Sequence, residues 1–357
     1  MVNQIAILCN YRLLPERVGG MDVFFWELDK QAKKEGINIT WFFPNSTLHG
    51  DYHLMDIKFN ESTSVEETFL KYNQTFEVVV THFVEIATPF FKIIKKKQLT
   101  SYTIVVDHNP RPINGYPIKK RISKKVKGFL FGKYIDRFIG VSAYTANELI
   151  NDFGFHIQKK VKVIYNGVLY RSILFKKKLK YKVPKFIVVS HLRPSKGIQD
   201  LIKSVDLLPI ELKKLLKIDI YGEGDFKQEL INQIRILKLE YVFTFKGSIS
   251  NIHELYYNYD YLLQPTHMEC FSLSILESLA ANVPVVTTPV GGNLEVVKDK
   301  LNGFIFPAKD FVKLAEVLEN ILSHKWKIEI ETRKLIEDNF SINQMVSNHL
   351  NIIKNLK

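Results

Sequence analysis

The sequence predicts an α/β protein of two domains, each a doubly wound parallel sheet, that face a cleft. Three observations support this fold class. The chain has 357 residues, which is too long for one ordinary hydrophobic core and right for two. Short apolar runs alternate with helical patterns, as strands and helices do in a parallel sheet. This alternation stops at a lysine-rich stretch and then begins again, so a second domain follows the first.

The first domain is predicted to span residues 1–172. Its first strand is followed by a loop with two glycines and by a helix over residues 21–34, which ends at Gly36. Apolar runs of strand length recur along the rest of this part. The expected strands are residues 2–9, 37–43, 78–80, 103–106, 138–141 and 161–164.

The second domain is predicted to span residues 185–339, after a lysine-rich linker at 173–184. It opens with a strand, a turn and a helix at 198–208. The expected strands are residues 186–189, 218–221, 242–245, 261–263 and 283–287. Ligands of such sheets bind at the carboxyl ends of the strands, so polar residues directly after strands are the candidate site residues.

Composition indicates a globular cytoplasmic protein. Hydrophobic residues make up 46% of the chain and charged residues 24%, as in ordinary soluble domains. The only two cysteines, Cys9 and Cys270, offer neither a disulfide framework nor a metal-ligand spacing, which favours a reducing compartment. No apolar run reaches the length of about eighteen residues that a membrane span needs, and no signal peptide is recognisable. We therefore expect a protein that neither crosses a membrane nor is exported.

The net charge of +13 is concentrated in residues 92–137. This segment holds thirteen Lys or Arg residues against Asp107 and Asp136. Within it, residues 117–130 form an amphipathic helical pattern that can lie on an anionic membrane surface. A helix packed on the core with a solvated basic face explains the pattern as well. No RNA-binding or helix-turn-helix motif accompanies it, so no nucleic-acid partner is expected.

Two carboxylates eight residues apart say most about the chemistry. Glu269 is expected in a loop after a strand, and Glu277 inside the helix that follows. The amides of residues 271–273 would then lie at a helix N-terminus, where free N–H groups and the helix dipole bind anions. Read alone, the pair suggests the acid and base of a hydrolase. Beside an anion site, it suggests a ligand with hydroxyls and phosphate.

A cationic turn follows the first strand of the second domain. It carries His191, Arg193 and Lys196 and ends at Gly197, where a helix begins. Arginine grips phosphate oxygens with a planar fork, and lysine offers a mobile point charge. The turn therefore predicts a diphosphate site, with a solvated turn before a helix as the alternative.

Candidate residues in the first domain also follow strands. Gly19 and Gly20 open a helix, where missing Cβ atoms allow backbone to approach a phosphate or an acceptor, although a plain tight turn explains them almost as well. His82 and His108 end two strands of the predicted sheet. A neutral imidazole both donates and accepts hydrogen bonds, so these rings can contact a sugar hydroxyl or a phosphate.

Taken in order, these motifs resemble those of the retaining glycosyltransferases of the GT-B fold, family four. The most specific element is the spacing of Glu269 and Glu277 in Glu-Cys-Phe-Ser-Leu-Ser-Ile-Leu-Glu, similar to the family's Glu-x7-Glu motif. The resemblance spans nearly the whole chain. Its elements are residues 19–20, 141–142, 166–168, 192–197, 221–224, 269–277 and 290–292.

The resemblance implies two Rossmann-like domains, with an acceptor bound mainly by the first and a nucleotide-sugar by the second. A C-terminal helix within residues 340–357 would pack back on the first domain. The implied catalytic residues are His108, Glu269, Lys196 and Arg193. The implied donor-binding residues are Gly19, Gly20, His191, Cys270, Phe271, Ser272, Leu273 and Glu277.

By resemblance, Glu269 contacts the hydroxyls of the donor sugar and Glu277 contacts the ribose. Lys196 and Arg193 hold the diphosphate, and His108 touches the transferred sugar. The donor is a UDP-sugar or a GDP-sugar, and neither a cofactor nor a catalytic metal is expected.

Some positions depart from the family pattern. His191 stands where the family has Arg, so either His191 or Arg193 meets the diphosphate. Cys270 and Ser272 replace the usual glycines around Phe271, and Leu169 replaces a usual Asp.

The expected function is that of a retaining, metal-independent glycosyltransferase. It would move a hexose-type sugar to a glycan or lipid-linked glycan acceptor in the synthesis of polysaccharide, lipopolysaccharide or glycolipid. The alternatives are a GT-B relative of another class, such as a nucleotide-sugar epimerase or a phosphorylase, and a non-catalytic protein that binds sugars or anionic lipid.

Overall fold

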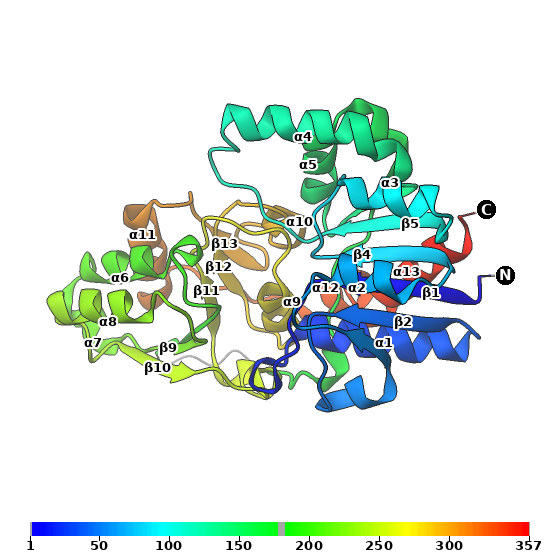
Figure 1. Ribbon diagram of the computed structural model, residues 1–357. Helices are drawn as coiled ribbons and strands as arrows, with labels where there is room; N and C mark the ends of the chain where they lie inside the picture. Colours follow the sequence, from blue (N-terminus) through cyan, green and yellow to red (C-terminus); the bar gives the residue numbers. More distant parts are fainter. Residues whose placement is uncertain (1, 178–182, 357) are drawn as a thin grey trace. The chain divides into compact units, whose positions relative to one another are not determined.

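The computed structural model describes residues 2–177 and 183–356, which form two compact units (Figure 1). The first unit comprises Met1–Asn166 and Ile342–Lys357, and the second comprises Gly167–Ser341. Part of the predicted linker, residues 178–182, lies outside the described residues. The segment directly after the boundary contacts the second unit, since the Val168 amide donates to the Phe340 carbonyl over 3.0 Å.

The first unit contains a seven-stranded parallel sheet in the order β3-β2-β1-β4-β5-β6-β7. The direction of winding reverses between β1 and β4, where Cys9 and His82 are register partners. Such a reversal is where doubly wound sheets bind ligands, at the carboxyl ends of the strands. The strands are β1 Gln4–Cys9, β2 Asn38–Phe43, β3 Asp56–Phe59, β4 Phe76–His82, β5 Thr100–Asp107, β6 Arg137–Gly140 and β7 Val161–Val163.

Helices of the first unit connect and cover these strands. They are α1 Gly20–Lys34, α2 Val65–Tyr72, α3 Pro89–Lys96, α4 Ile118–Phe131, α5 Ala143–Phe153 and α13 Ile342–Lys354. The helix α13 packs along α1, and Lys354 Nζ lies 2.7 Å from Glu35 Oε2. This C-terminal helix is therefore part of the first unit.

The second unit contains a six-stranded parallel sheet in the order β10-β9-β8-β11-β12-β13. Here the winding reverses between β8 and β11. The strands are β8 Phe186–Val189, β9 Ile218–Tyr221, β10 Phe243–Gly247, β11 Tyr261–Gln264, β12 Val285–Thr287 and β13 Gly303–Ile305. The helices are α6 Ile198–Asp206, α7 Ile210–Leu215, α8 Lys227–Ile236, α9 Leu273–Ala280, α10 Asn293–Val296, α11 Phe311–Leu322 and α12 Arg333–Asn339.

The predicted fold class of two doubly wound α/β domains is confirmed. The central strands are buried on both faces, as in β1, where residues 5–9 are fully buried. Burial of each large apolar side chain contributes roughly 1.5–3 kcal/mol, which is why continuous apolar runs form central strands.

The prediction missed β3 because its sequence, Asp-Ile-Lys-Phe, is short and polar. It is one of the two edge strands of the first sheet, and Asp56 and Lys58 on it form an ion pair of 2.8 Å. Charged side chains on an edge strand oppose pairing with another chain, so an edge position tolerates a pattern that a central strand does not.

Candidate active site

Several loops of the second unit meet at the carboxyl ends of its strands. Residues 190–197 follow β8, residues 265–272 follow β11, and residues 288–292 follow β12. The turn after β8 is joined to the loop after β11, because His267 N and Thr266 Oγ1 both donate to the Ser195 carbonyl, over 2.8 Å and 3.2 Å. The structure thus brings together the predicted cationic turn and the loop that carries the first of the two carboxylates.

Lys196 and Glu269 form an ion pair within this cluster of loops. The distance from Lys196 Nζ to Glu269 Oε2 is 2.7 Å, and both side chains are largely buried. The other carboxylate oxygen, Oε1, accepts a hydrogen bond of 3.2 Å from Cys270 N. Each side chain therefore holds the other in place. A bound phosphate can take the place of Glu269 beside Lys196, and a bound hydroxyl can take the place of Lys196 beside Glu269.

Gly197 allows the close contact between these two loops. Its φ is +71°, and a Cβ atom there would lie 1.8 Å from the Pro265 carbonyl oxygen. Only glycine combines this left-handed backbone with such a close approach. Lys196 is consequently held one residue before a fixed contact point.

Gly291 performs the same task on the loop after β12. Its φ is +59°, and a Cβ atom would lie 2.0 Å from the Glu269 carbonyl oxygen. The next amide, Gly292 N, donates to the Cys270 carbonyl over 2.8 Å. The backbone that carries Glu269 is thus clamped on both sides.

The helix α9 begins directly after this loop, as predicted. Ser272 is its N-cap, and its hydroxyl accepts from Ile275 N. Gln264 Nε2 donates to the hydroxyls of Ser272 and Ser274. The serine that replaces a family glycine therefore serves as a cap, and it uses one of the amides at this helix N-terminus for the cap itself.

Glu277 lies inside α9, as predicted, and is joined to a tyrosine that the sequence analysis did not identify. Tyr256 Oη donates to Glu277 Oε2 over 2.9 Å. Burial raises the pKa of Glu277 to about 7, although the Tyr256 hydrogen bond opposes this shift. Tyr256 comes from a short 3-10 turn before β11, and no local sequence signal connects it with Glu277.

His191 and Arg193 are exposed on the turn after β8. Leu192, between them, is fully buried and anchors the turn in the core. Because exposed and buried residues alternate along this turn, both candidate contacts to the diphosphate, His191 and Arg193, are exposed to solvent.

In the first unit, two predicted histidines touch each other. His82 Nδ1 lies 3.0 Å from His108 Nε2, at the carboxyl ends of β4 and β5. His349 of α13 joins them, with its ring centroid 5.8 Å from that of His82. Burial lowers the pKa of His108 and of His349 to about 3 and that of His82 well below its usual value, so all three rings are neutral at physiological pH.

The Gly19-Gly20 loop is fastened by Asp22, a residue that the sequence analysis did not select. Asp22 is fully buried and accepts hydrogen bonds from Gly19 N, Tyr11 Oη and Tyr52 Oη, over 2.8, 3.0 and 2.7 Å. The carboxylate therefore sets the geometry at the start of α1.

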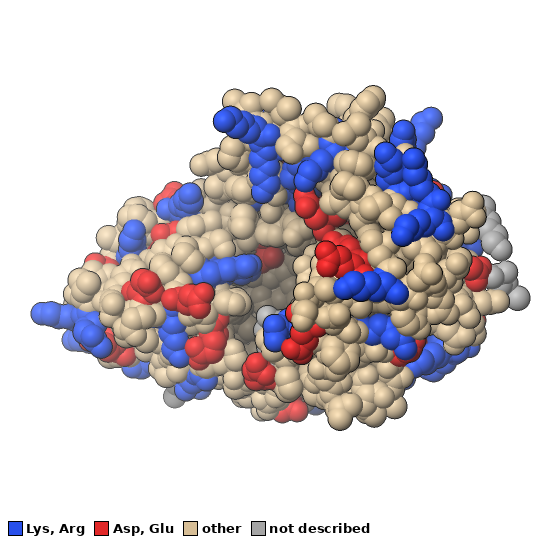
Figure 2. All heavy atoms as spheres, viewed as in Figure 1, with Lys and Arg blue, Asp and Glu red and all other residues tan. Residues whose placement is uncertain are grey.

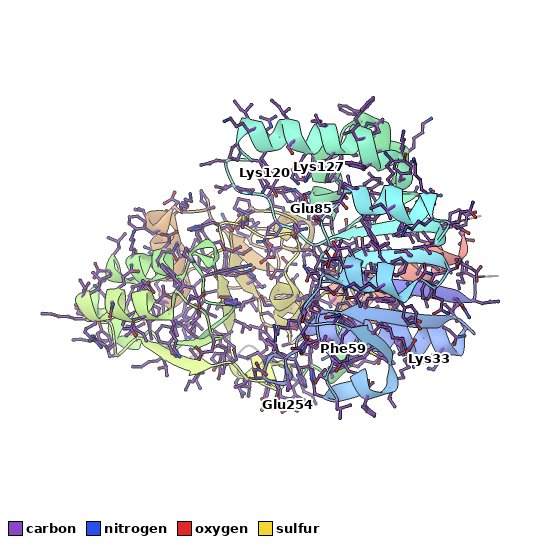
Figure 3. All side chains as sticks on the ribbon, in the orientation of Figure 1. Lys33, Phe59, Glu85, Lys120, Lys127 and Glu254 are labelled. Atoms are coloured by element: carbon purple, nitrogen blue, oxygen red, sulfur yellow. The ribbon has the colours of Figure 1, made fainter. Side chains whose placement is uncertain are left out.

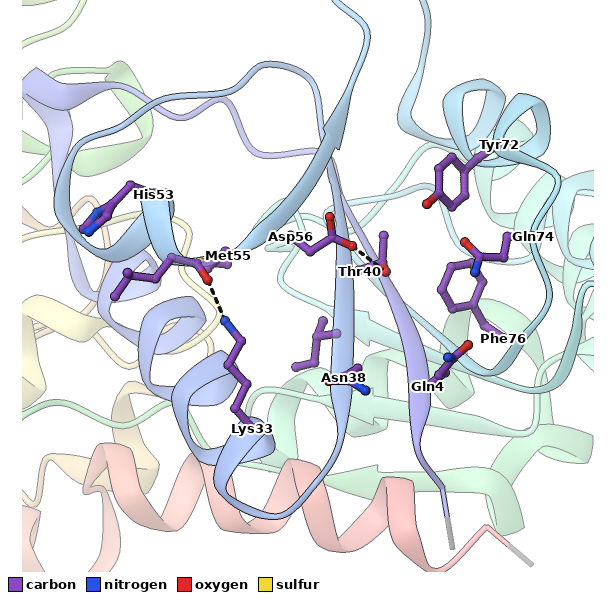
Figure 4. A pocket seen from close by; sticks show the side chains of 12 residues that line it. Gln4, Lys33, Asn38, Thr40, His53, Met55, Asp56, Tyr72, Gln74 and Phe76 are labelled. Atoms are coloured by element: carbon purple, nitrogen blue, oxygen red, sulfur yellow. Dashed lines mark hydrogen bonds between the residues drawn. The ribbon is translucent and has the colours of Figure 1, made fainter.

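A separate pocket of about 570 Å³ lies at the amino ends of the strands of the first sheet, away from their carboxyl ends (Figure 4). It is lined by residues at the amino ends of strands, such as Gln4 and Asn38. Its main cation, Lys33, is already bound to the Leu54 carbonyl and to Asp29. We therefore assign the candidate site to the carboxyl ends. Within residues 2–177 and 183–356, no group of three potential His, Cys, Asp or Glu ligands lies close enough to hold a metal ion.

Residues 171–339 match the family described as glycosyl transferases group 1. The second unit belongs to the group 1 glycosyl transferases. The match contains the loops and both carboxylates described above, and the group 1 domain accounts for nearly all of this unit.

Similar proteins extend the comparison beyond the group 1 domain. An uncharacterized glycosyltransferase of Methanocaldococcus jannaschii is 26% identical over 55% of this chain, which spans only 54% of the relative's own length. The capsular polysaccharide biosynthesis glycosyltransferase CapM of Staphylococcus aureus is 27% identical over 67% of this chain and 69% of its own. The Anabaena protein HepE, solved in complex with UDP-glucose, covers 98% of this chain and 99% of its own with a TM-score of 0.77 at 16% identity. The fold is that of the GT-B glycosyltransferases.

Proposed function

We propose that the protein is a retaining glycosyltransferase that moves a hexose-type sugar from a UDP-sugar or a GDP-sugar to a glycan or lipid-linked glycan. The observation that carries this proposal is the Lys196–Glu269 ion pair at the loop before α9. A lysine, a carboxylate and a helix N-terminus within one cluster of loops match a ligand that has both a diphosphate and sugar hydroxyls.

Each group has a role in donor binding. Glu269 accepts hydrogen bonds from the hydroxyls of the donor sugar, and Glu277, deeper in α9, accepts from the ribose. Lys196 binds the diphosphate, together with backbone amides of residues 271–273 at the N-terminus of α9. His191 and Arg193 are exposed beside Lys196, and Arg193 is the stronger candidate because its guanidinium carries a permanent charge.

Transfer needs stabilisation of the departing diphosphate. The bond between the anomeric carbon and the diphosphate oxygen breaks, and the acceptor oxygen bonds to the same face of that carbon. The acceptor's proton passes to the departing phosphate oxygen. Positive groups that are already in place stabilise the developing charge, so the reaction proceeds without a metal ion. His108 contacts the transferred sugar as a neutral hydrogen-bonding group.

We place the enzyme in the cytoplasm, as a peripheral protein of the cytoplasmic membrane face, in the synthesis of cell-surface polysaccharide, lipopolysaccharide or glycolipid. CapM carries the name of a capsular polysaccharide enzyme, which supports this class of acceptor. No helix in the described ranges is both long and apolar enough to span a bilayer, and a peripheral association fits that finding.

A donor panel tests the proposal. Release of nucleoside diphosphate is measured with UDP- and GDP-sugars, with lipid-linked and soluble glycan acceptors, in the presence of EDTA. We expect turnover with one donor and an α-linked product from an α-linked donor. Inversion of the linkage would contradict retention, loss of activity with EDTA would contradict metal independence, and no turnover with any donor would remove the transferase assignment.

A further inference from the structure

The helix α4 turns its apolar side toward solvent. Its apolar residues Ile118, Ile122, Val126, Phe129 and Leu130 have exposed fractions of 72, 58, 50, 76 and 48%. Their spacing by three and four residues places them on one face of the helix. We call these five residues the apolar stripe. A contiguous stripe of this kind on a water-soluble surface marks an interaction site.

The opposite side of α4 attaches the helix to its unit. Gly128 is buried against α5, where a Cβ atom would lie 2.1 Å from a backbone carbonyl oxygen. Lys124 Nζ lies 2.9 Å from Asp152 Oδ2, and Lys127 pairs with Glu85, toward which it points in Figure 3. The inward side of α4 therefore consists of a glycine contact and ion pairs.

Exposed basic residues flank the apolar stripe. Lys119, Arg121 and Lys125 are exposed, and α4 contains no acidic residue. Figure 2 shows Lys and Arg side chains beside uncharged atoms on the part of the surface that α4 forms in Figure 1. The surface thus combines apolar groups that avoid water with positive charges that favour an anionic partner.

This arrangement corrects one reading of the sequence. A helix packed on the core with a solvated basic face was one of the alternatives for residues 117–130. That alternative is wrong, because the apolar face is exposed and the side chain of Lys124 is directed to the largely buried Asp152. A core-packed helix and a membrane-surface helix have the same amphipathic pattern, so only the packing of α4 distinguishes these two readings.

We propose that α4 lies in the interface of an anionic phospholipid bilayer, with the apolar stripe inserted and Lys119, Arg121 and Lys125 among the headgroups. The helix has 14 residues, which suits an orientation in the membrane plane and is too short for a span. The inference rests on the proposed location at the membrane face and names the element responsible. Its test requires no sugar transfer, so it can fail while the transferase assignment stands.

Insertion is measured directly with Phe129→Trp in the full chain. The probe is a vesicle of phosphatidylcholine and phosphatidylglycerol, with and without brominated acyl chains, and phosphatidylcholine alone is the comparison. We expect a blue shift of the added emission and quenching by the brominated lipid. Ile236→Trp is the matched control, because Ile236 is 78% exposed on α8 in the other unit. It should show neither effect.

Two sets of substitutions separate insertion from charge. Ile122→Ser with Phe129→Ser should weaken vesicle sedimentation more than about tenfold, whereas Ile236→Ser with Val312→Ser, also exposed, should not. Lys119→Gln with Lys125→Gln should weaken binding about fivefold per charge on anionic vesicles. Absence of quenching in Phe129→Trp, or unchanged sedimentation of the serine variant, would overturn the proposal. Thermal melts of these surface variants are the control for correct folding.

Discussion

His82 Nδ1 lies 3.0 Å from His108 Nε2, so one of the two rings donates a hydrogen bond to the other. The second nitrogen of His82, Nε2, is buried without a hydrogen-bond partner among the described residues. A buried N–H without a partner is costly. His82 therefore carries its proton on Nδ1 and donates it, which leaves His108 protonated on Nδ1 and accepting at Nε2.

The first prediction concerns this tautomer. His82→Phe removes the donor, so His108 should shift toward the form protonated on Nε2, because its Nε2 lone pair loses its partner. Imidazole nitrogen resonances in long-range proton–nitrogen spectra distinguish the two forms. His349→Phe, which alters a neighbouring ring without touching this hydrogen bond, is the control and should leave the tautomer unchanged. An unaltered His108 spectrum in His82→Phe would contradict the assignment.

A second prediction concerns stability in acid. Burial lowers the folded-state pKa of His349 to about 3, whereas the ordinary value is 6.5. Between these values the unfolded chain binds the additional proton, so the free energy of unfolding falls as the pH drops below 6.5. Each such histidine contributes up to about 1.4 kcal/mol per pH unit.

His349→Phe should therefore give a shallower loss of stability below pH 6.5, measured by urea denaturation across a pH series. The His53→Phe variant serves as the control, because His53 is exposed on the same unit. Equal slopes in His349→Phe and the wild type would show that His349 is not held neutral by burial.

The contribution of Glu277 to the free energy of unfolding should depend on pH in the opposite sense to that of His349. Its pKa is raised from 4.5 to about 7, so the folded protein binds more protons than the unfolded chain between these values, and stability falls as the pH rises through this window. Glu277→Gln removes the titration and keeps an acceptor for Tyr256. Relative to the wild type, its unfolding free energy should gain up to about 3 kcal/mol between pH 4.5 and 7. A difference that stays constant with pH would contradict the raised pKa.

The Lys196–Glu269 ion pair predicts separable effects on activity and stability. Lys196→Ala should lower transfer by about a hundredfold or more, because it removes a positive group at the diphosphate. It should also cost about 1–3 kcal/mol of stability, since the largely buried Glu269 loses its partner. Combining Lys196→Ala with Glu269→Gln should restore much of the stability and none of the transfer. Recovery of transfer in the double variant would contradict direct roles for both residues.

Gly291 offers a test of the backbone clamp around Glu269. Gly291→Ala forces a Cβ atom against the Glu269 carbonyl and should destabilise the protein by about 3 kcal/mol or more while weakening UDP or GDP binding. Gly115→Ala is the matched control, since Gly115 has a similar φ of +70° with no atom near its Cβ position. It should cost only about 1–2 kcal/mol and leave nucleotide affinity unchanged. Denaturation and calorimetric titration measure the two effects, and equal stability losses would show that the close approach is unimportant.

Much of the fold and of the candidate site was predictable because it depends on local pattern. Apolar runs such as residues 186–189 form buried strands wherever they occur, so the sequence predicted both sheets. The position of Glu269 in a loop and of Glu277 inside α9 followed from helix signals in the same segment. The cationic turn before α6 was also recognisable from local sequence, because it lies between a strand pattern and a helix pattern.

Contacts between distant segments were decided only by the tertiary structure. Tyr256 reaches Glu277 and His349 reaches His82 through packing of elements whose separation in sequence carries no signal. The orientation of α4 is the clearest example. Its spacing determines that one face is apolar, but the close contact of Gly128 with α5 and the Lys124–Asp152 ion pair decide that this face meets solvent. A helical pattern specifies which residues share a face, and only its neighbours determine where that face points.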